Sequence, residues 1–443
     1  MKSIGWELKS KDAIHIDETR KAMNLATSMY FWQKGDYPVG LFPHVSLTTQ
    51  AKALEAAEEV RERARKFKPG NQFDSLVVRD ADTNARIVSN VFSYFHNPDD
   101  HRFNAFLDRV YGEGTYEALL DSVRPQNYPH DIIHRATERK FELGCVLSVE
   151  PEAYMGSPTN FTREKGRVLE QVKQRYGHVK RFVADLKQAG SLDGLIFDLA
   201  PASSPFSTFD GGVFMCAIGL TGIYVVRKGN GFEVLESMCA PTAVHEIAGH
   251  AVQNKLSDKY MPAGLRDSTN ESLRFIHGPV SEGVALETEE FGFEHMKKHQ
   301  KLWGLTEQEI SDAQILCDAY IPRQLPQLVY SAFWFERMAW EDVKNMPPLY
   351  NLEPSTRLAR LMGTDTFRKD KNELKDLSFE DFAQYLSYWA GQRRIRPMHN
   401  AMKTMGVPPE VAFRAIHLGL WCDAKAQRDF IFKIELPAQG YSS

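Results

Sequence analysis

Two histidines five positions apart constrain this chain more than any other feature. The stretch AVHEIAGHAVQ, residues 243–253, has the composition of a helix and carries His245, Glu246 and His250. Each residue of a regular α-helix turns by about 100°, so side chains five apart diverge by about 140° and do not meet. A π-bulge, which inserts one residue into a turn, would bring both imidazoles to one face. Gly249 precedes the second histidine, where backbone freedom would ease such a bulge.

The overall composition is that of a globular protein with a substantial core. The 443 residues are 43% hydrophobic and 25% charged, and 54 basic side chains nearly balance 58 acidic ones. We therefore expect no nucleic acid as a partner. We also expect no membrane as a partner and a cytoplasmic location, because we find neither a secretory signal nor an apolar run of roughly 18 residues.

The five cysteines are scattered along the chain and form no C-x-x-C pair. We interpret them as reduced and mostly buried thiols, which is typical of a cytoplasmic protein. They are Cys145, Cys216, Cys239, Cys317 and Cys422.

Apolar residues at three-and-four spacing predict helices over most of residues 1–190. The segments with this pattern or with strong helix formers are 46–67, 82–97, 100–112, 129–144 and 160–190. After Gly190 the sequence becomes rich in Ile, Val and Phe, and a KGNG turn lies within 227–233. These features predict a small β-sheet of two to four strands, after which helices resume near Pro241.

A catalytic zinc site needs a third protein ligand and one open position. The segment FIHGPVSEGVALETEEF, residues 275–291, carries four glutamates, of which we select Glu282 because it opens a helix beside Gly283. Gly283 would leave space for a close approach to the metal. Glu287 is then a candidate to orient one of the histidines. The alternative is that His245 and His250 are two partly buried histidines on different helix faces.

HEIAGH and the later SEGVAL, residues 281–286, resemble the two motifs of gluzincin metallopeptidases with a lengthened HExxxH motif. The dipeptidyl peptidase III and tyrosine carboxypeptidase families have this lengthened form. The separation of 37 residues between His245 and Glu282 is similar to that in the tyrosine carboxypeptidase group. The resemblance covers about 50 of the 443 residues, and Ser281 stands where that group usually has an acid.

The resemblance implies a gluzincin-like metallopeptidase fold, mainly α, with a small β-sheet preceding the active-site helix. It implies that His245, His250 and Glu282 hold one Zn²⁺ ion and that Glu246 is the general base. Iron or manganese is not excluded, because two histidines and a glutamate do not select the metal. We expect a helical N-terminal part, 1–190, and a catalytic part, 191–443, with the β insert at 191–235, in one continuous unit.

A hydrolase of this type needs a second donor for the developing oxyanion. Tyr330 and His277 are our candidates, and their alternatives are a core aromatic and a loop histidine without a role. Arg393 and Arg394 follow a predicted helix end and could hold a substrate carboxylate, since arginine binds carboxylates with two hydrogen bonds. The alternative for these arginines is a solvated basic turn.

The sequence thus favours a zinc-dependent hydrolase of amide bonds, a peptidase that is carboxypeptidase-like or acts on short peptides. A second hypothesis is a metal-dependent enzyme, with iron or manganese, whose substrate is a small non-peptide metabolite. A third is a non-catalytic protein on the same scaffold. The presence of Glu246 argues against this third hypothesis, because such a protein needs no general base.

Overall fold

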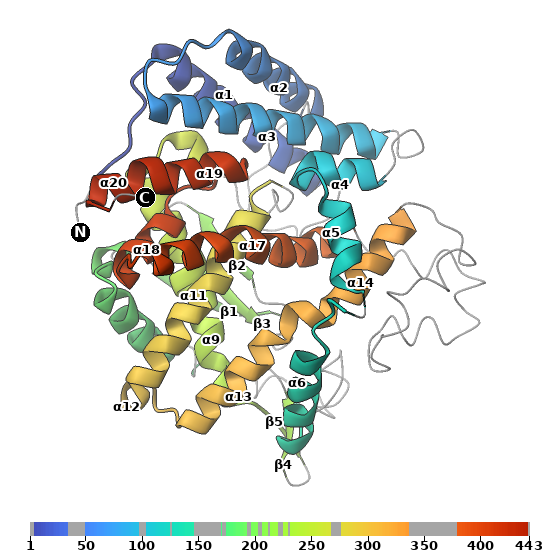
Figure 1. Ribbon diagram of the computed structural model, residues 1–443, viewed down its shortest axis with the longest axis vertical. Coiled ribbons are helices and arrows are strands. Elements are labelled where there is room, and N and C mark those ends of the chain that lie inside the picture. The colour runs from blue at the N-terminus through green and yellow to red at the C-terminus, as the bar shows by residue number, and fades with distance from the viewer. Residues whose placement is uncertain are drawn as a thin grey trace.

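The computed structural model is mainly helical, with β1, β2 and β3 near its centre and β4 and β5 at its lower end (Figure 1). None of the helices in the described part of the chain combines the length and hydrophobicity that crossing a bilayer demands. The structure describes residues 4–33, 49–96, 103–124, 126–145, 170, 174–192, 196–202, 206–210, 213–219, 225–228, 231–266, 276–335 and 379–441.

Helices occupy most of the described N-terminal residues. The helix expected at 82–97 begins ten residues earlier, because the side chain of Asn71 accepts a hydrogen bond of 2.8 Å from the backbone N–H of Asp74. Of the helix expected at 160–190, residues 174–185 are described as helical, and most of the preceding part lies outside the described residues. The helices are α1 (Lys11–Gln33), α2 (Thr49–Lys66), α3 (Gln72–His96), α4 (Phe103–Tyr111), α5 (Thr115–Ser122), α6 (His130–Glu142) and the short η1 (Ala189–Leu192).

Five strands follow, one more than the upper limit expected from the sequence, and they form two separate sheets. In the first sheet β3 is central, with β1 parallel on one side and β2 antiparallel on the other. In the second, β4 and β5 pair antiparallel with Lys228 opposite Gly231. The strands are β1 (Ile196–Ala202), β2 (Phe206–Asp210), β3 (Val213–Gly219), β4 (Val225–Lys228) and β5 (Gly231–Val234). The apolar stretch 211–226, which the sequence predicts to form one or two buried strands, contains β3 and the start of β4.

The remaining described residues are again almost entirely helical. The histidine-bearing segment η3 (Val244–Ala251) is a π-helix between two α-helices. The helices are η2 (Glu236–Met238), α9 (Cys239–Ala243), η3, α10 (Val252–Tyr260), η4 (Ala263–Leu265), α11 (Gly278–Lys298), α12 (Gln300–Trp303), α13 (Glu307–Asp318), α14 (Tyr320–Phe335), α17 (Phe379–Thr404), α18 (Pro409–His417), α19 (Ala424–Phe430), η9 (Ile431–Glu435) and α20 (Leu436–Gln439).

Two clusters of buried apolar side chains form the core. The first surrounds η3 and includes Val244, Val284 and Phe413. The second joins the N-terminal helices to later ones, since Phe103 of α4 belongs to the same cluster as Phe382 of α17. The division of the chain at residue 190 remains a prediction, and apolar contacts cross it.

Helices α11 and α17 cross at two glycines. A Cβ on Gly283 would lie 2.5 Å from the carbonyl oxygen of Gly391, so a side chain there would push the two helices apart. The sequence analysis had assigned Gly283 to close approach of the metal. The structure shows that it permits close approach of α17 instead.

Four of the five cysteines are described with their side chains, and all four are free thiols. Cys145, Cys239 and Cys422 are buried and Cys317 is partly buried, as expected from the sequence. Cys216 lies in β3, and its side chain is outside the described residues.

Candidate metal centre

The π-helix predicted from the histidine spacing is present. Segment η3 covers eight residues, and the N–H of Val252 donates to the carbonyl of Ile247, five residues earlier. With this winding, His245 and His250 share one face. Their ring centroids lie 4.9 Å apart and the ring planes are inclined by 80°.

Neighbouring helices hold η3 in place. A Cβ on Gly249 would lie 2.8 Å from the Cα and from the Cβ of Ala285, so only glycine allows η3 to approach α11 this closely. The sequence analysis had given backbone freedom as the reason for Gly249, and the structure gives close packing instead. On another side, Nε2 of His417 lies 3.0 Å from the carbonyl oxygen of Ala248. This contact supplies a hydrogen-bond partner to a buried π-helical carbonyl.

Glu282 of α11 faces both histidines. Its Oε2 atom lies 3.3 Å from Nε2 of His245 and 3.5 Å from Nε2 of His250. One ligand atom from each residue falls within 4.8 Å of the others. A tetrahedral zinc ion with bonds of ~2.0–2.1 Å separates its ligand atoms by about 3.3 Å. The spacing of these donors therefore fits a zinc ion.

The electrostatics of the group also fit a cation. Oε2 of Glu282 is buried and has no hydrogen-bond partner within the described residues. Burial alone would raise the pKa of Glu282. The neighbouring His250 and His245 together outweigh this effect and hold the pKa well below its usual range. Burial lowers the pKa of His245, while Glu282 and Glu289 raise it well above its ordinary value. A buried carboxylate oxygen without a hydrogen bond is stabilised by a positive charge beside it.

The Nδ1 atoms of both histidines have partners on α11. Nδ1 of His245 lies 2.6 Å from Oε1 of Glu289, and Nδ1 of His250 lies 2.9 Å from Oγ of Ser281. When each Nδ1–H donates to its oxygen, each Nε2 lone pair is directed toward Glu282. Both rings are thereby held in the tautomer that a metal ligand requires.

Glu287, which the sequence analysis proposed as the orienting carboxylate, has other partners. It accepts a hydrogen bond of 2.7 Å from Nε of Arg396 and lies 2.8 Å from Nδ1 of His399. Both partners belong to α17, so Glu287 joins α11 to that helix. Glu289, two residues later, lies beside His245 and has the contact with a histidine that the sequence predicts for Glu287.

Glu246 is buried within η3, beside His245, and is 6% exposed. In the part of the chain that the structure describes, its carboxylate has no hydrogen bond or ion pair. It contributes to the electrostatic field at both histidines, whose pKa values it helps to raise. Within the described residues, this carboxylate is therefore not engaged by another side chain.

Tyr388 of α17 is a neighbour of the centre that the sequence analysis missed. Its ring centroid lies 6.1 Å from that of His245, and it packs edge-on against Tyr320 at 5.3 Å. The sequence offered only the aromatic pair in SYWAG, more than 100 residues after the motif. Such a pair is ordinarily part of a core, so only the fold identifies it.

His277, one of the two predicted oxyanion donors, has its contacts outside this group. Nε2 of His277 lies 3.3 Å from Nδ2 of Asn24, and Nδ1 lies 3.8 Å from Sγ of Cys422. His277 therefore links the start of α11 to α1 and to the chain before α19. Tyr330 lies in α14, and its side chain is outside the described residues.

The two predicted substrate arginines also have other surroundings. Arg394 donates to the carbonyls of Trp421 and Cys422 and to the side chain of Gln427, so each of its three guanidinium nitrogens has a partner. Arg393 is exposed and lies over the ring of Trp389, 5.0 Å from the centroid. Neither arginine contacts His245, His250 or Glu282.

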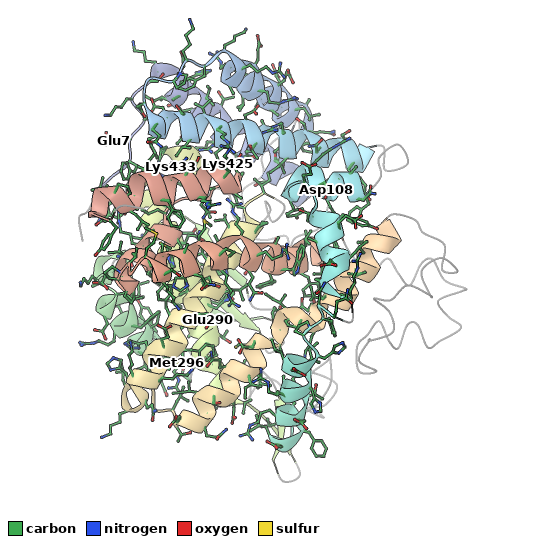
Figure 2. The ribbon with its side chains drawn as sticks, in the orientation of Figure 1. Glu7, Asp108, Glu290, Met296, Lys425 and Lys433 are labelled. Atoms are coloured by element: carbon green, nitrogen blue, oxygen red, sulfur yellow. The ribbon has the colours of Figure 1, made fainter. Side chains whose placement is uncertain are left out.

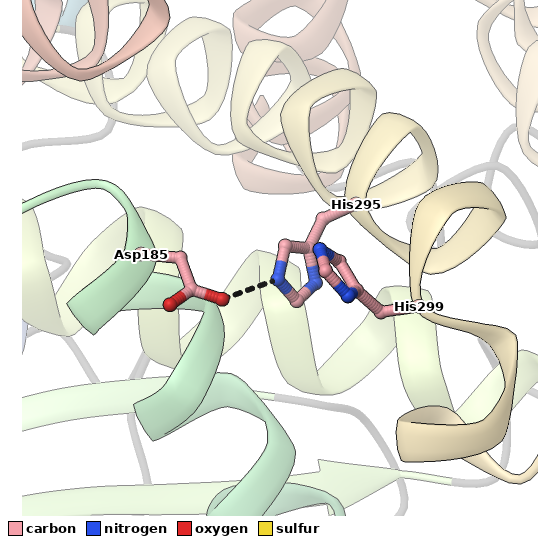
Figure 3. A group of neighbouring side chains, drawn as sticks. All are labelled: Asp185, His295 and His299. Atoms are coloured by element: carbon pink, nitrogen blue, oxygen red, sulfur yellow. Dashed lines mark hydrogen bonds and ion pairs between the residues drawn. The ribbon is translucent and has the colours of Figure 1, made fainter.

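A second cluster of possible metal ligands consists of Asp185, His295 and His299 (Figure 3). Nδ1 of His295 accepts a hydrogen bond of 3.0 Å from the indole N–H of Trp303. A neutral His295 therefore carries its proton on Nε2, which lies 3.1 Å from Asp185 and donates to it. Because neither nitrogen of His295 then offers a free lone pair, and His299 only packs against its ring, this cluster does not supply three metal ligands.

No protein-family model matches the chain, and no curated protein matches it. A solved structure of a Pyrococcus furiosus carboxypeptidase aligns with 96% of this chain and 99% of its own. The TM-score is 0.40 and the sequence identity is 12%. A likeness at this level does not assign a function, which has to come from the chain's own residues.

Proposed function

We propose that this chain is a metal-dependent hydrolase of amide bonds with a gluzincin-like fold, a zinc peptidase that acts on short peptides or on chain ends. The observation that supports it most is the position of Glu282. Its orphaned Oε2 lies between the Nε2 atoms of His245 and His250, at distances that match a tetrahedral ion.

His245, His250 and Glu282 would hold the ion, and two nitrogen donors with one oxygen donor suit zinc. When bound, the ion supplies Lewis acidity, which makes a water molecule more acidic and a carbonyl carbon more electrophilic. Glu289 and Ser281 hold the two imidazoles in the required orientation through Nδ1.

Glu246 is the general base in this proposal. Its carboxylate takes a proton from the attacking water and delivers it to the nitrogen of the leaving amine. Tyr388 donates a hydrogen bond to the carbonyl oxygen as that oxygen gains negative charge. The burial of Glu246 and both histidines keeps bulk water away, which strengthens each of these interactions.

The experiment compares wild type with Glu246→Gln in a mixed peptide library and measures bound metal in both. We expect the variant to retain its metal and to lose hydrolysis by about 10²–10⁴-fold, since it keeps the ligands and lacks the base. Glu294→Gln, at an exposed position of α11, is the matched control and should behave as wild type. Near-normal hydrolysis by Glu246→Gln would exclude Glu246 as the base. A zinc-loaded wild type that cleaves no peptide would exclude a peptidase.

A further inference from the structure

A cavity of about 650 Å³ is lined by residues other than those of the candidate metal centre. Its walls come from α3, the turn between α4 and α5, one face of α17 and the start of α19. None of His245, Glu246, His250, Glu282 and Tyr388 lines it. The volume is within the range of about 300–1,000 Å³ that is typical of small-molecule sites.

The walls carry more positive than negative charge. Six cationic side chains face three carboxylates, so three positive charges are not balanced within the lining. The cations are Arg79, Arg86, Arg109, Arg393, Arg394 and Lys425, and the carboxylates are Asp108, Glu113 and Asp423. Figure 2 labels Asp108 on α4 and Lys425 on α19, two walls that are far apart in the sequence.

Part of this charge is already paired within the protein. Arg79 donates two hydrogen bonds, of 3.2 and 3.1 Å, to Asp423. Arg86 pairs with Asp82, 3.3 Å away. These pairs hold the wall together, and they use one of the three carboxylates.

Other cations of the wall have no such partner. Within the described residues, neither Arg109 nor Lys425 makes an ion pair, and Arg393 contacts only the ring of Trp389. Arg394 is bonded to neutral oxygens, so its charge is solvated by dipoles and not cancelled by a carboxylate. Four positive charges from three separate segments therefore surround one space, together with the two remaining carboxylates of the lining, Asp108 and Glu113.

The floor of the cavity is apolar. Ile87, Val110 and Trp389 line it and are at most 7% exposed. A cavity with cationic walls and an apolar floor suits a molecule that has both an anionic part and an apolar part. Arginine binds phosphate and carboxylate groups with paired hydrogen bonds, and lysine adds a point charge.

We propose that this cavity binds a small organic anion with at least two negative charges, carried by phosphate or carboxylate groups, whose apolar part rests on Ile87, Val110 and Trp389. The site is independent of the proposed hydrolase centre, with which it shares no residue. Binding here therefore needs no metal and no Glu246.

Calorimetric titration of the full chain tests this proposal, with ATP as the phosphate probe and citrate as the carboxylate probe. The ionic strength is held constant, because salt screens exposed charges. We expect at least one probe to bind, and Arg109→Gln combined with Lys425→Gln to weaken its binding by about tenfold or more. The probe that binds more tightly identifies the anionic group.

The control pair is Lys298→Gln with Lys301→Gln, which removes the same charge from exposed positions outside the cavity. This pair and Glu246→Gln should both bind the probe as wild type does. The proposal is overturned if neither probe binds, or if the control pair weakens binding as much as the cavity pair. Thermal melting of each variant confirms that the exposed substitutions leave the fold intact.

Discussion

Gly249 of η3 packs directly against Ala285 of α11. A Cβ on Gly249 would lie 2.8 Å from both the Cα and the Cβ of Ala285, a distance that side chains do not tolerate. The contact joins the segment that carries both histidines to the helix that carries Glu282. The separation of the three candidate ligands therefore depends on a position that has no side chain.

Gly249→Ala should weaken metal binding and destabilise the protein by about 1–3 kcal/mol. The added methyl group forces η3 away from α11, and this strain exceeds the gain of about 1 kcal/mol that alanine brings to a helix. Urea unfolding and metal titration measure the two effects. Gly177→Ala is the control, because Gly177 lies in the helical residues 174–185 with open space around it. That control should leave stability unchanged or raise it, and a Gly249→Ala variant that behaved likewise would contradict the packing argument.

Glu289→Gln should lower metal affinity by about 10–100-fold with little change in fold. The carboxylate 2.6 Å from Nδ1 of His245 increases the basicity of that ring and fixes its orientation, and an amide does this less well. A competition titration with a chelator gives the affinity. Glu294→Gln on the same helix is the matched control. Equal affinities in the two variants would show that Glu289 does not support His245.

Tyr388→Phe should lower kcat by about 10²-fold and leave metal content unchanged. The phenol ring lies beside His245, and its hydroxyl would stabilise the oxyanion only in the transition state. Tyr128→Phe, far from the centre in the sequence and packed against His130, is the control. If kcat stayed constant and only KM rose, Tyr388 would bind substrate and not the oxyanion.

The local part of the candidate site could be predicted from the sequence, because helix geometry alone decides whether His245 and His250 can meet. Glu282 could also be predicted from the sequence, because it follows the motif in a helix of suitable composition. Glu289 and Tyr388 were not, because their roles arise from the packing of α11 and α17 around η3. Sequence spacing does not reveal such contacts.

The predicted substrate arginines show that suitable side-chain chemistry does not by itself identify a binding residue. Arg394 had the chemistry of a carboxylate clamp, but its partners are backbone carbonyls of Trp421 and Cys422, which no residue pattern indicates. Helices were predictable from periodicity, whereas the number of strands was not, because a short apolar stretch is compatible with either one strand or two. The catalytic roles of Glu246 and Tyr388 remain proposals, which the hydrolysis measurements on Glu246→Gln and Tyr388→Phe test.

His277 should make the fold sensitive to acid. Burial and the nearby charges of Arg20 and Arg394 lower the pKa of His277 to about 3, below the value of about 6.5 in an unfolded chain. The folded state thus binds fewer protons, so the stability from this group is complete above about pH 6.5. Below that pH, the free energy of unfolding decreases by about 1.4 kcal/mol per pH unit until the pH reaches about 3.

Urea unfolding of chelated wild type and His277→Gln at about pH 7 and about pH 5 measures this effect. Because the variant lacks the titrating ring, its stability relative to wild type should rise by about 2 kcal/mol on acidification. His134→Gln, at an exposed position beside Glu138, should show no such change. A difference between wild type and His277→Gln that is the same at both pH values would contradict a neutral His277 in the folded protein.

The most direct measurement of the central proposal is the metal content of the full chain, purified without added metal, for wild type, His250→Ala, Glu282→Gln and Glu246→Gln. We predict about one zinc ion per chain in wild type and in Glu246→Gln, and a loss of the ion from the two ligand variants. Wild-type protein without bound metal, or metal that persists in both His250→Ala and Glu282→Gln, would contradict a metal centre formed by His245, His250 and Glu282.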